Sequence, residues 1–286
     1  MSKLKKLNIS LVFVACLLCA FLCATACADG AEEDVSYVET PIYIDGLLST
    51  RGYLDGGVTY LPLETACAVL GYDTVSDFNT DINTLTVSAA GINIRVCGDD
   101  PYFTANGRYF FMPDGYREID GLFAVPIDVL AKLFTLELRW DEQLGAYDLD
   151  TANEAPILSG DEFYNDEDLY WMSRIITYEA GNQPIEGQIG VGNVVLNRVK
   201  SDVFADTVKD VIFQPGQFNP VASKAIFLDP FESGIISAKL VLEGYNTVGD
   251  SLYFHMGNYG EKWMSENESF VIKIGDHYFF TRIDNF

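Results

Sequence analysis

One glutamate, Glu179, stands where its neighbours predict a proton donor. The apolar residues Ile175 and Ile176 come one helical turn before it, and Gly181 follows as a natural helix end. Burial among apolar groups raises the pKa of a carboxyl, and the negative end of a helix opposes its ionisation further. A carboxyl that keeps its proton near neutral pH can act as a general acid. The alternative is an exposed glutamate at the frayed end of a helix.

A stripe of polar and small residues follows Glu179 in the next predicted helix. Glu186, Gly190, Asn193 and Asn197 recur at helical spacing and therefore share one face. The two amides can bond sugar hydroxyls, which makes Asn193 and Asn197 candidate substrate-binding residues, or they can hold the backbone of a loop. Glu186 can supply a second carboxylate or be an ordinary acidic residue of a helix N-terminus.

Three predicted helices and a group of short strands position these side chains. The first helix starts after the capping residue Asn165 and ends at Gly181, and Pro184 opens the second. A third helix is predicted over Gly234–Glu243, and the stretch Ser251–Phe280 alternates as short strands around Gly-rich turns. The C-terminal domain is therefore expected to be mainly helical with a small β part.

Several motifs in this domain occur in a family-like order. The segment from Tyr178 to Phe218 is YEAGNQPIEGQIGVGNVVLNRVKSDVFADTVKDVIFQPGQF, and it is followed later by Leu252-Tyr253-Phe254 and by IGDHYF at residues 274–279. Together these motifs resemble the cell-wall hydrolase family that includes the spore cortex-lytic enzymes, over about residues 165–286. The sequence departs from the family pattern at Gly190 and Gly192, where the family often has alanine.

The resemblance implies a fold, a substrate and a site. The fold is a compact α+β core similar to goose-type lysozymes and lytic transglycosylases, and the substrate is the muramic acid–glucosamine backbone of peptidoglycan. Glu179 is the first residue of the family's EA motif, which implies that it is catalytic. Further residues fall in motifs that line or support the groove and are implied to bind substrate: Gln217, Phe218, Tyr253 and His277. A core phenylalanine, a capping glutamine and a structural histidine are the alternatives.

The number of carboxylates decides the expected chemistry. Most glycosidases use two carboxylates, whereas a lytic transglycosylase needs one, and the sequence offers one convincing candidate. Glu179 would protonate the glycosidic oxygen and then take a proton from the muramyl 6-hydroxyl, which closes a 1,6-anhydro ring without water. A non-catalytic peptidoglycan-binding protein and an N-acetylmuramoyl amidase-type hydrolase are the alternatives. We expect no cofactor and no metal, because the chain has two histidines and no H-E-x-x-H or P-loop pattern.

The first half of the chain carries a faint internal repeat. Residues 57–63, GVTYLPL, align with residues 121–127, GLFAVPI, at an offset of 64. Each copy predicts a short strand and a helix opened by a proline, and residues 85–87 and 92–96 alternate as strands do. The repeat resembles the copper amine oxidase N-terminal-like domain, which implies an accessory or wall-binding module; a plain spacer is the alternative. The stretch contains no histidine, so no copper site is expected.

The sequence as a whole predicts an α+β protein of two domains. An N-terminal mixed β/α tandem-repeat domain spans residues 37–150, a linker spans 151–160, and the mainly helical lysozyme-like or lytic-transglycosylase-like domain spans 161–286. The net charge is −24 with no visible basic patch, which argues against nucleic acid as a partner. Peptidoglycan glycan strands are the expected partner.

The start of the chain predicts export. Lysines precede Leu11–Cys23, an unbroken apolar run of 13 residues that is short for a spanning helix. Small residues follow, which predicts a signal peptide over residues 1–28 and a linker over 29–36; an uncleaved anchor and a lipid on Cys27 are the alternatives. We therefore expect a secreted or cell-envelope protein with no membrane contact after cleavage. Cys67 and Cys97 can form a disulfide in that compartment or remain thiols.

Overall fold

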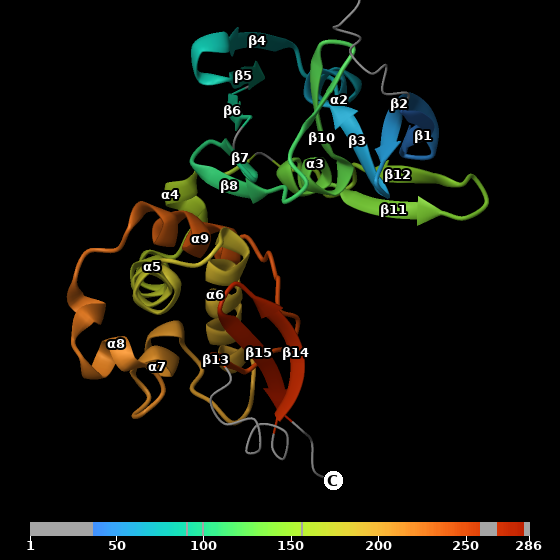
Figure 1. Ribbon diagram of the computed structural model, residues 1–286. Helices are drawn as coiled ribbons and strands as arrows, with labels where there is room; N and C mark the ends of the chain where they lie inside the picture. The colour runs from blue at the N-terminus through green and yellow to red at the C-terminus, as the bar shows by residue number, and fades with distance from the viewer. Residues whose placement is uncertain (1–36, 90, 99, 156, 258–267, 283–286) are drawn as a thin grey trace, which may run out of the picture. The chain divides into compact units, whose positions relative to one another are not determined.

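The computed structural model describes residues 37–89, 91–98, 100–155, 157–257 and 268–282 (Figure 1). The predicted signal peptide and the linker over residues 29–36 lie outside these residues. Contacts within the chain separate Met1–Val38 from a compact unit, Glu39–Phe286, which holds the helices and sheets. Among the described residues, no helix combines the length and the apolar character that crossing a membrane requires.

A seven-stranded sheet forms the centre of the N-terminal domain, with strand order β11-β12-β1-β2-β3-β10-β9. Its strands are β1 (Val38–Ile44), β2 (Leu47–Asp55), β3 (Val58–Pro62), β9 (Arg117–Ile119), β10 (Leu122–Pro126), β11 (Glu137–Asp141) and β12 (Ala146–Asp150). β1 pairs with β12 in parallel, whereas β3 and β10 are antiparallel, with Leu61 opposite Val125. The β1–β2 hairpin turns at Asp45-Gly46, where both residues have the positive φ that a two-residue turn of this kind needs.

Two strands of this sheet each lead directly into a short helix. β3 continues into α2 (Leu63–Val69), and β10 continues into α3 (Ile127–Leu133), 64 residues further along. Pro62 and Pro126 stand immediately before the helices, where a missing backbone N–H costs nothing. Cys67 is buried in α2 and Cys97 is half-buried, and both are free thiols.

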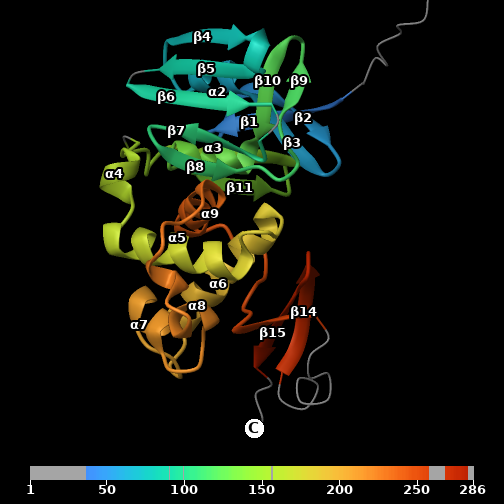
Figure 2. The same cartoon turned by 60° about the vertical axis from the view of Figure 1, so that its left-hand side comes forward.

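A second sheet of five strands is antiparallel throughout, as Figure 2 shows in cyan and green. Its strands are β4 (Thr74–Asn79), β5 (Thr84–Ala89), β6 (Ile92–Cys97), β7 (Tyr102–Ala105) and β8 (Arg108–Phe111), and a short 3-10 helix, η1 (Thr80–Ile82), joins the first two. Alternate residues of β5 and β6, including Leu85, Val87 and Ile94, are buried in the domain core. The sequence predicted these two strands from that alternation.

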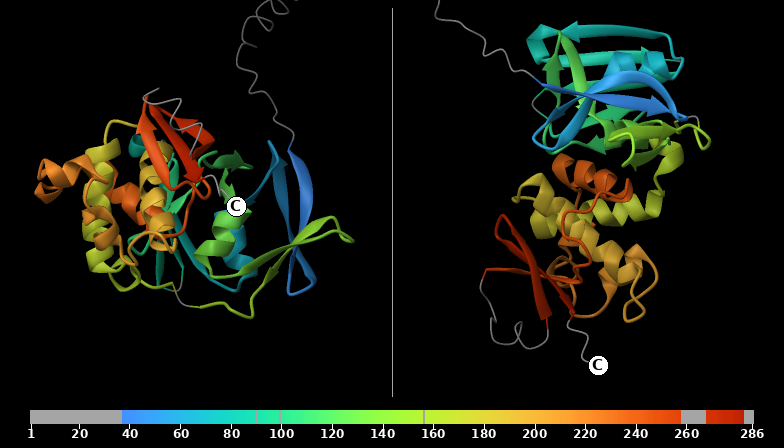
Figure 3. Two further views of the ribbon diagram at one scale, coloured as in Figure 1. Left: turned by 90° about the horizontal axis from the view of Figure 1, so that it is seen from below. Right: turned by 90° about the vertical axis from the view of Figure 1, so that its right-hand side faces the viewer.

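The C-terminal domain is a group of helices with a three-stranded sheet. Its helices are α4 (Gly160–Phe163), α5 (Asp166–Ala180), α6 (Ile185–Val199), α7 (Val208–Phe213), α8 (Asn219–Ala222), η2 (Ala225–Phe227) and α9 (Glu232–Leu242). Its sheet has the order β13-β15-β14, formed by β13 (Tyr253–Met256), β14 (Glu268–Ile274) and β15 (His277–Arg282), of which β14 and β15 are red in Figure 3. The mixed α+β class predicted for the chain is confirmed.

A buried ion pair links β8 to the residue after α9. Arg108 donates from Nε and Nη2 to the two carboxylate oxygens of Glu243, at 2.8 and 2.7 Å, and the hydroxyl of Tyr164 donates to the same carboxylate at 2.8 Å. Both charged side chains are almost fully buried. This bidentate geometry satisfies the two charges together, so removing either partner would leave the other unpaired.

Candidate active site

Helix α5 delivers Glu179 to the site from its last turn. The helix begins as predicted, since the side chain of Asn165 accepts a hydrogen bond from the N–H of Asp168 at 3.0 Å. Met172, Ile175 and Ile176 are fully buried and anchor the helix in the core. Figure 1 shows α5 nearly end on, with α6 running past it. The position of Glu179 is therefore fixed by a well-packed helix rather than by a loop.

Glu179 itself is half-buried and carries a strongly perturbed carboxyl. Burial raises its pKa from an ordinary 4.5 to about 7, while the backbone N–H of Asn219 and the charge of Arg198 oppose that rise. The carboxyl therefore holds a proton through much of the neutral range. The Asn219 N–H and the charge of Arg198 both favour the carboxylate that forms when the proton leaves. This combination suits a general acid that later acts as a base.

The stripe on α6 holds a loop in place. Asn193 is buried; its amide donates to the carbonyl of Tyr245 at 2.7 Å and accepts from the N–H of Thr247 at 3.0 Å. Asn197 donates to the carbonyls of Gly249 and Ser251 at 2.8 and 2.9 Å. These contacts favour the hypothesis that the two amides hold the backbone of a loop over the hypothesis that they bind sugar hydroxyls. They fix the loop over residues 245–251, which leads into β13.

The two unusual glycines of α6 allow close packing at the same place. A Cβ added to Gly190 would come within 2.8 Å of both Phe279 and Val248. A Cβ added to Gly192 would come within 2.7 Å of Val241. The departures from alanine noted in the sequence therefore have a packing reason: they let β15, the loop and α9 approach the helix closely.

Arg198 is the main functional candidate that the sequence reasoning missed. It is 4% exposed, and its Nε donates to the carbonyl of Leu252 at 2.8 Å. Its guanidinium carbon lies 5.1 Å from the ring of Phe218 and 5.7 Å from the ring of Tyr253. A single arginine near the end of an otherwise apolar helix face was the available signal.

The family-motif residues fall into two groups in the structure. Tyr253 is half-buried and Gln217 is exposed, so both remain open to a ligand. Phe218 is 5% exposed and packs near Phe254, with ring centroids 6.4 Å apart. His277 is 1% exposed and lies 5.2 Å from Phe254, and burial lowers its pKa. These positions favour supporting roles for Phe218 and His277.

A second carboxylate, Glu268, lies near Arg198 but is enclosed. It is 5% exposed, and its Oε2 lies 3.4 Å from Nε2 of His255. Burial raises its pKa, whereas His255 and Arg198 lower it. Sequence reasoning did not single out Glu268, because nothing in its local pattern shows that the chain buries it.

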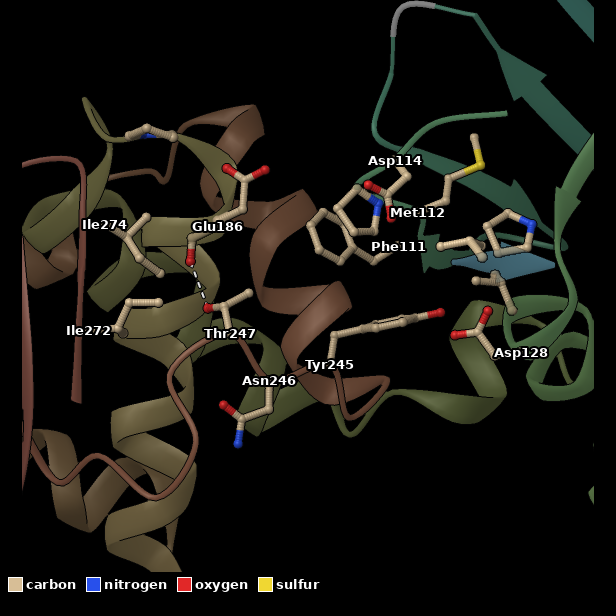
Figure 4. Close-up of a pocket in the computed structure, with 15 residues that line it drawn as sticks. Phe111, Met112, Asp114, Asp128, Glu186, Tyr245, Asn246, Thr247, Ile272 and Ile274 are labelled. Carbon is tan, nitrogen blue, oxygen red and sulfur yellow. Dashed lines mark hydrogen bonds between the residues drawn. The ribbon is translucent and has the colours of Figure 1, made fainter. Parts of the chain in front are cut away.

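Glu186, half-buried in the first turn of α6, lines a cavity. This cavity has a volume of about 700 Å³, and Figure 4 shows Glu186, Asp114, Asp128 and Tyr245 around it. The carbonyl of Glu186 accepts a hydrogen bond from the hydroxyl of Thr247 at 2.8 Å. Glu179 does not line this cavity. Among the residues that the structure describes, no cluster of three or more His, Cys, Asp or Glu side chains is arranged to hold a metal ion.

Each half of the chain matches a known protein family. Residues 182–280 match the family Cell Wall Hydrolase, just after Glu179, and residues 46–147 match the family Copper amine oxidase N-terminal domain. A spore cortex-lytic enzyme of Oceanobacillus iheyensis is 31% identical over 124 residues, which is 43% of this chain and 45% of that protein. A spore cortex-lytic enzyme of Bacillus cereus is 34% identical over 117 residues, which is 41% of this chain and 45% of that protein.

Among solved structures, the catalytic domain of a germination-specific lytic transglycosylase from Bacillus anthracis is 33% identical. The match covers 41% of this chain and 97% of that chain, with a TM-score of 0.39. The chain spans less than half the length of the curated relatives it matches. The C-terminal domain of this chain, over residues 182–280, therefore belongs to the cell wall hydrolase family, and residues 46–147 form a copper amine oxidase N-terminal domain.

Proposed function

We propose that this protein is an exported glycosidase that cleaves the muramic acid–glucosamine backbone of peptidoglycan, in the vegetative wall or in spore cortex. The observation that carries the proposal is Glu179, whose half-buried carboxyl has a pKa of about 7 and stands at the edge of a cell wall hydrolase domain. The relatives named spore cortex-lytic enzymes support a wall substrate.

The first step of the proposed reaction is proton donation. Glu179 gives its proton to the glycosidic oxygen, and the bond to the muramyl C1 breaks as positive charge develops on that sugar. The carboxylate left behind accepts the backbone N–H of Asn219, which stabilises it. The sugar's own N-acetyl group or nearby dipoles stabilise the cationic centre.

The second step closes a ring. The Glu179 carboxylate removes the proton from the muramyl 6-hydroxyl, whose oxygen bonds to C1 and forms the 1,6-anhydro sugar. Glu179 is then protonated again, so the cycle needs no water and no second carboxylate. The burial of Glu268 and its contact with His255 support this choice, because a carboxylate 5% exposed has little surface to offer a sugar or a nucleophilic water. The proposed activity is therefore that of a lytic transglycosylase.

Substrate contacts are proposed for the accessible motif residues. Gln217 and Tyr253 are exposed and half-buried, respectively, and carry groups that bond sugar hydroxyls. Phe218 and His277 would support them from the core, and Asn193 and Asn197 would act through the loop that they hold. The helical domain would then be lysozyme-like in its use of one acid on a rigid helix.

The remaining parts of the chain complete the proposal. The copper amine oxidase N-terminal domain serves as an accessory, wall-binding module built from two related strand–helix units. The proposed domains span residues 37–150 and 161–286 and are joined by a linker over 151–160. A cleaved signal peptide over residues 1–28 would deliver the protein to the cell envelope or the medium.

The test is digestion of purified peptidoglycan by the protein and by Glu179→Gln, followed by analysis of the soluble products. We expect anhydromuramyl ends from the protein and none from the variant. New reducing ends would indicate hydrolysis, and free stem peptides would indicate an amidase. Binding without any cleavage would support the non-catalytic alternative. Full activity of Glu179→Gln would rule out the assigned acid.

A further inference from the structure

The guanidinium of Arg198 is held in an unusual state for an arginine. It is buried near the end of α6, with its Nε fixed on the carbonyl of Leu252 at 2.8 Å. Within the part of the chain that the structure describes, no hydrogen-bond partner faces its Nη1. Three rings enclose it, since Phe204, Phe218 and Tyr253 lie 4.9, 5.1 and 5.7 Å from the guanidinium carbon. A buried cation with spare N–H groups needs compensating negative charge nearby.

Glu179 supplies one part of that compensation. Phe218, which packs against Arg198, is followed by Asn219, whose N–H donates to the Glu179 carboxylate. The same short segment thus ties the cation to the acid. Burial lowers the pKa of Arg198 and raises that of Glu179, and the charge of each residue opposes the shift of the other. Arg198 and the Asn219 N–H both oppose the rise in the pKa of Glu179 that burial causes.

Glu268 supplies the other part. It is buried at the start of β14, and His255 on β13 lies 3.4 Å from its Oε2. The strand register puts Glu268 and His255 on one face of the sheet, because they lie opposite Arg282 and Tyr278 of β15, two positions on the same face of that strand. The charged and titratable groups around Arg198 are therefore Glu179 from α5, Tyr253 from β13 and Glu268 from β14.

We propose that Arg198 is a positioning residue for Glu179: its buried guanidinium stabilises the carboxylate that Glu179 becomes after giving up its proton, and Glu268, held by His255, balances that cation in the resting site. This inference rests on the proposed function, because it assigns Arg198 a role only if Glu179 is the acid. Arg198 does not touch the sugar in this scheme, since its free N–H group is enclosed by protein.

Arg198 and Glu268, two opposite charges that act on each other, are then expected to shift the pKa of Glu179 in opposite directions. A cation close to a carboxyl favours the ionised form, so removal of the Arg198 charge raises the pKa of Glu179. Glu268 and Glu179 both act on the Arg198 charge, so we expect loss of the Glu268 charge to leave the cation to Glu179 and to lower the pKa of Glu179. The general acid must be protonated to act, so activity declines at alkaline pH as Glu179 loses its proton. The position of that decline reports the pKa of Glu179 directly.

The experiment is a pH–rate profile of peptidoglycan cleavage for the purified protein, Arg198→Met, Arg198→Lys and Glu268→Gln. We expect the alkaline decline to move to higher pH in Arg198→Met and to lower pH in Glu268→Gln. Arg198→Lys keeps the charge and is expected to retain the original position. The maximal rate of Arg198→Met should fall about tenfold or more, because the product carboxylate loses its counter-ion.

A matched control comes from an exposed pair of the same charges. Lys209 and Glu167 lie 2.8 Å apart on the surface, with 48% and 61% of their side chains exposed. Lys209→Met and Glu167→Gln remove the same charges and should leave the alkaline decline unmoved, because solvent screens them. A purely structural role for Arg198 would reduce the amount of active protein without moving the profile.

Two results would overturn the inference. One is an alkaline decline that moves in the same direction in Arg198→Met and in Glu268→Gln. The other is an alkaline decline that moves in neither variant. If Arg198→Met does not fold, Glu268→Gln decides alone, and an unmoved or upward profile refutes the proposal. Glu179→Gln assayed in parallel separates this failure from failure of the proposed function: an active Glu179→Gln refutes both, whereas an inactive one leaves Glu179 as the acid.

Discussion

Replacing Glu179 by glutamine should inactivate the protein and at the same time stabilise it above neutral pH. The carboxyl has a pKa of about 7 in the folded chain against an ordinary 4.5, because burial penalises the charged form. Between these two pH values the folded state binds more protons than the unfolded state. The free energy of unfolding therefore falls as pH rises from about 4.5 through about 7, and the full penalty is present above that window.

The magnitude follows from the same values. A tenfold change in an acid constant is worth about 1.4 kcal/mol, so the rise from 4.5 to about 7 corresponds to at most about 3.4 kcal/mol. Glu179 is half-buried, and solvent reaching the carboxyl reduces the penalty to roughly 1–2 kcal/mol. Glutamine keeps the oxygen that accepts the Asn219 N–H and has no charge to desolvate. The variant should therefore have a free energy of unfolding roughly 1–2 kcal/mol higher than the unchanged protein at pH 8, and almost the same value at pH 4.

Thermal melts of the protein and of Glu179→Gln at pH 4 and pH 8 provide the assay. For a chain of this size, 1 kcal/mol moves the midpoint by roughly 2–4 °C, so a rise of several degrees is expected at pH 8. The comparison at pH 4 is the internal control, since both side chains are neutral there. An equal difference at the two pH values, or a variant less stable at pH 8, would refute the reasoning about burial.

Two further predictions concern the buried ion pair of Arg108 and Glu243 and the close packing of α6. Glu243→Gln leaves Arg108 as an uncompensated buried cation and should lower the free energy of unfolding by about 3–5 kcal/mol in urea titrations; a loss below about 1 kcal/mol would contradict the pairing. Gly190→Ala should destabilise by about 1–2 kcal/mol despite the better helix propensity of alanine, because the new methyl group meets Phe279 and Val248 at 2.8 Å; a net gain in stability would show that both neighbours can give way.

The helices that carry the site could be predicted because their ends are set by local chemistry. Asn165 caps α5, and Pro184 stands immediately before α6, as the sequence indicated. These signals act within a few residues of one another, so they can be recognised in the sequence without knowledge of tertiary contacts. The third predicted helix differs only at its ends, since α9 runs from Glu232 to Leu242.

Other elements were missed although their signals were present. Asn106-Gly107 has positive φ at both residues and forms the turn between β7 and β8, which an Asn-Gly pair between apolar runs predicts. The short helices α7 and α8 offered less, because segments of six and four residues carry little periodicity.

The charge network of the site was beyond sequence reasoning for a physical reason. Arg198, Glu268 and His255 lie on separate elements. Only the tertiary fold buries the arginine and the glutamate where their charges interact. The amides of α6 show the same effect in another form. Their spacing predicted a common face, but spacing cannot say whether that face meets a sugar or a loop, and the contacts of Asn193 are with loop backbone.

The measurement that tests the central claim most directly is product analysis by mass spectrometry after digestion of purified peptidoglycan in ¹⁸O-labelled water. The account predicts Glu179-dependent muramyl ends that are lighter by one water than the hydrolytic product and carry no ¹⁸O, because the muramyl 6-hydroxyl is the nucleophile. Reducing ends that carry ¹⁸O would show that water attacks instead, and would contradict the proposal of a single acid and base closing an anhydro ring.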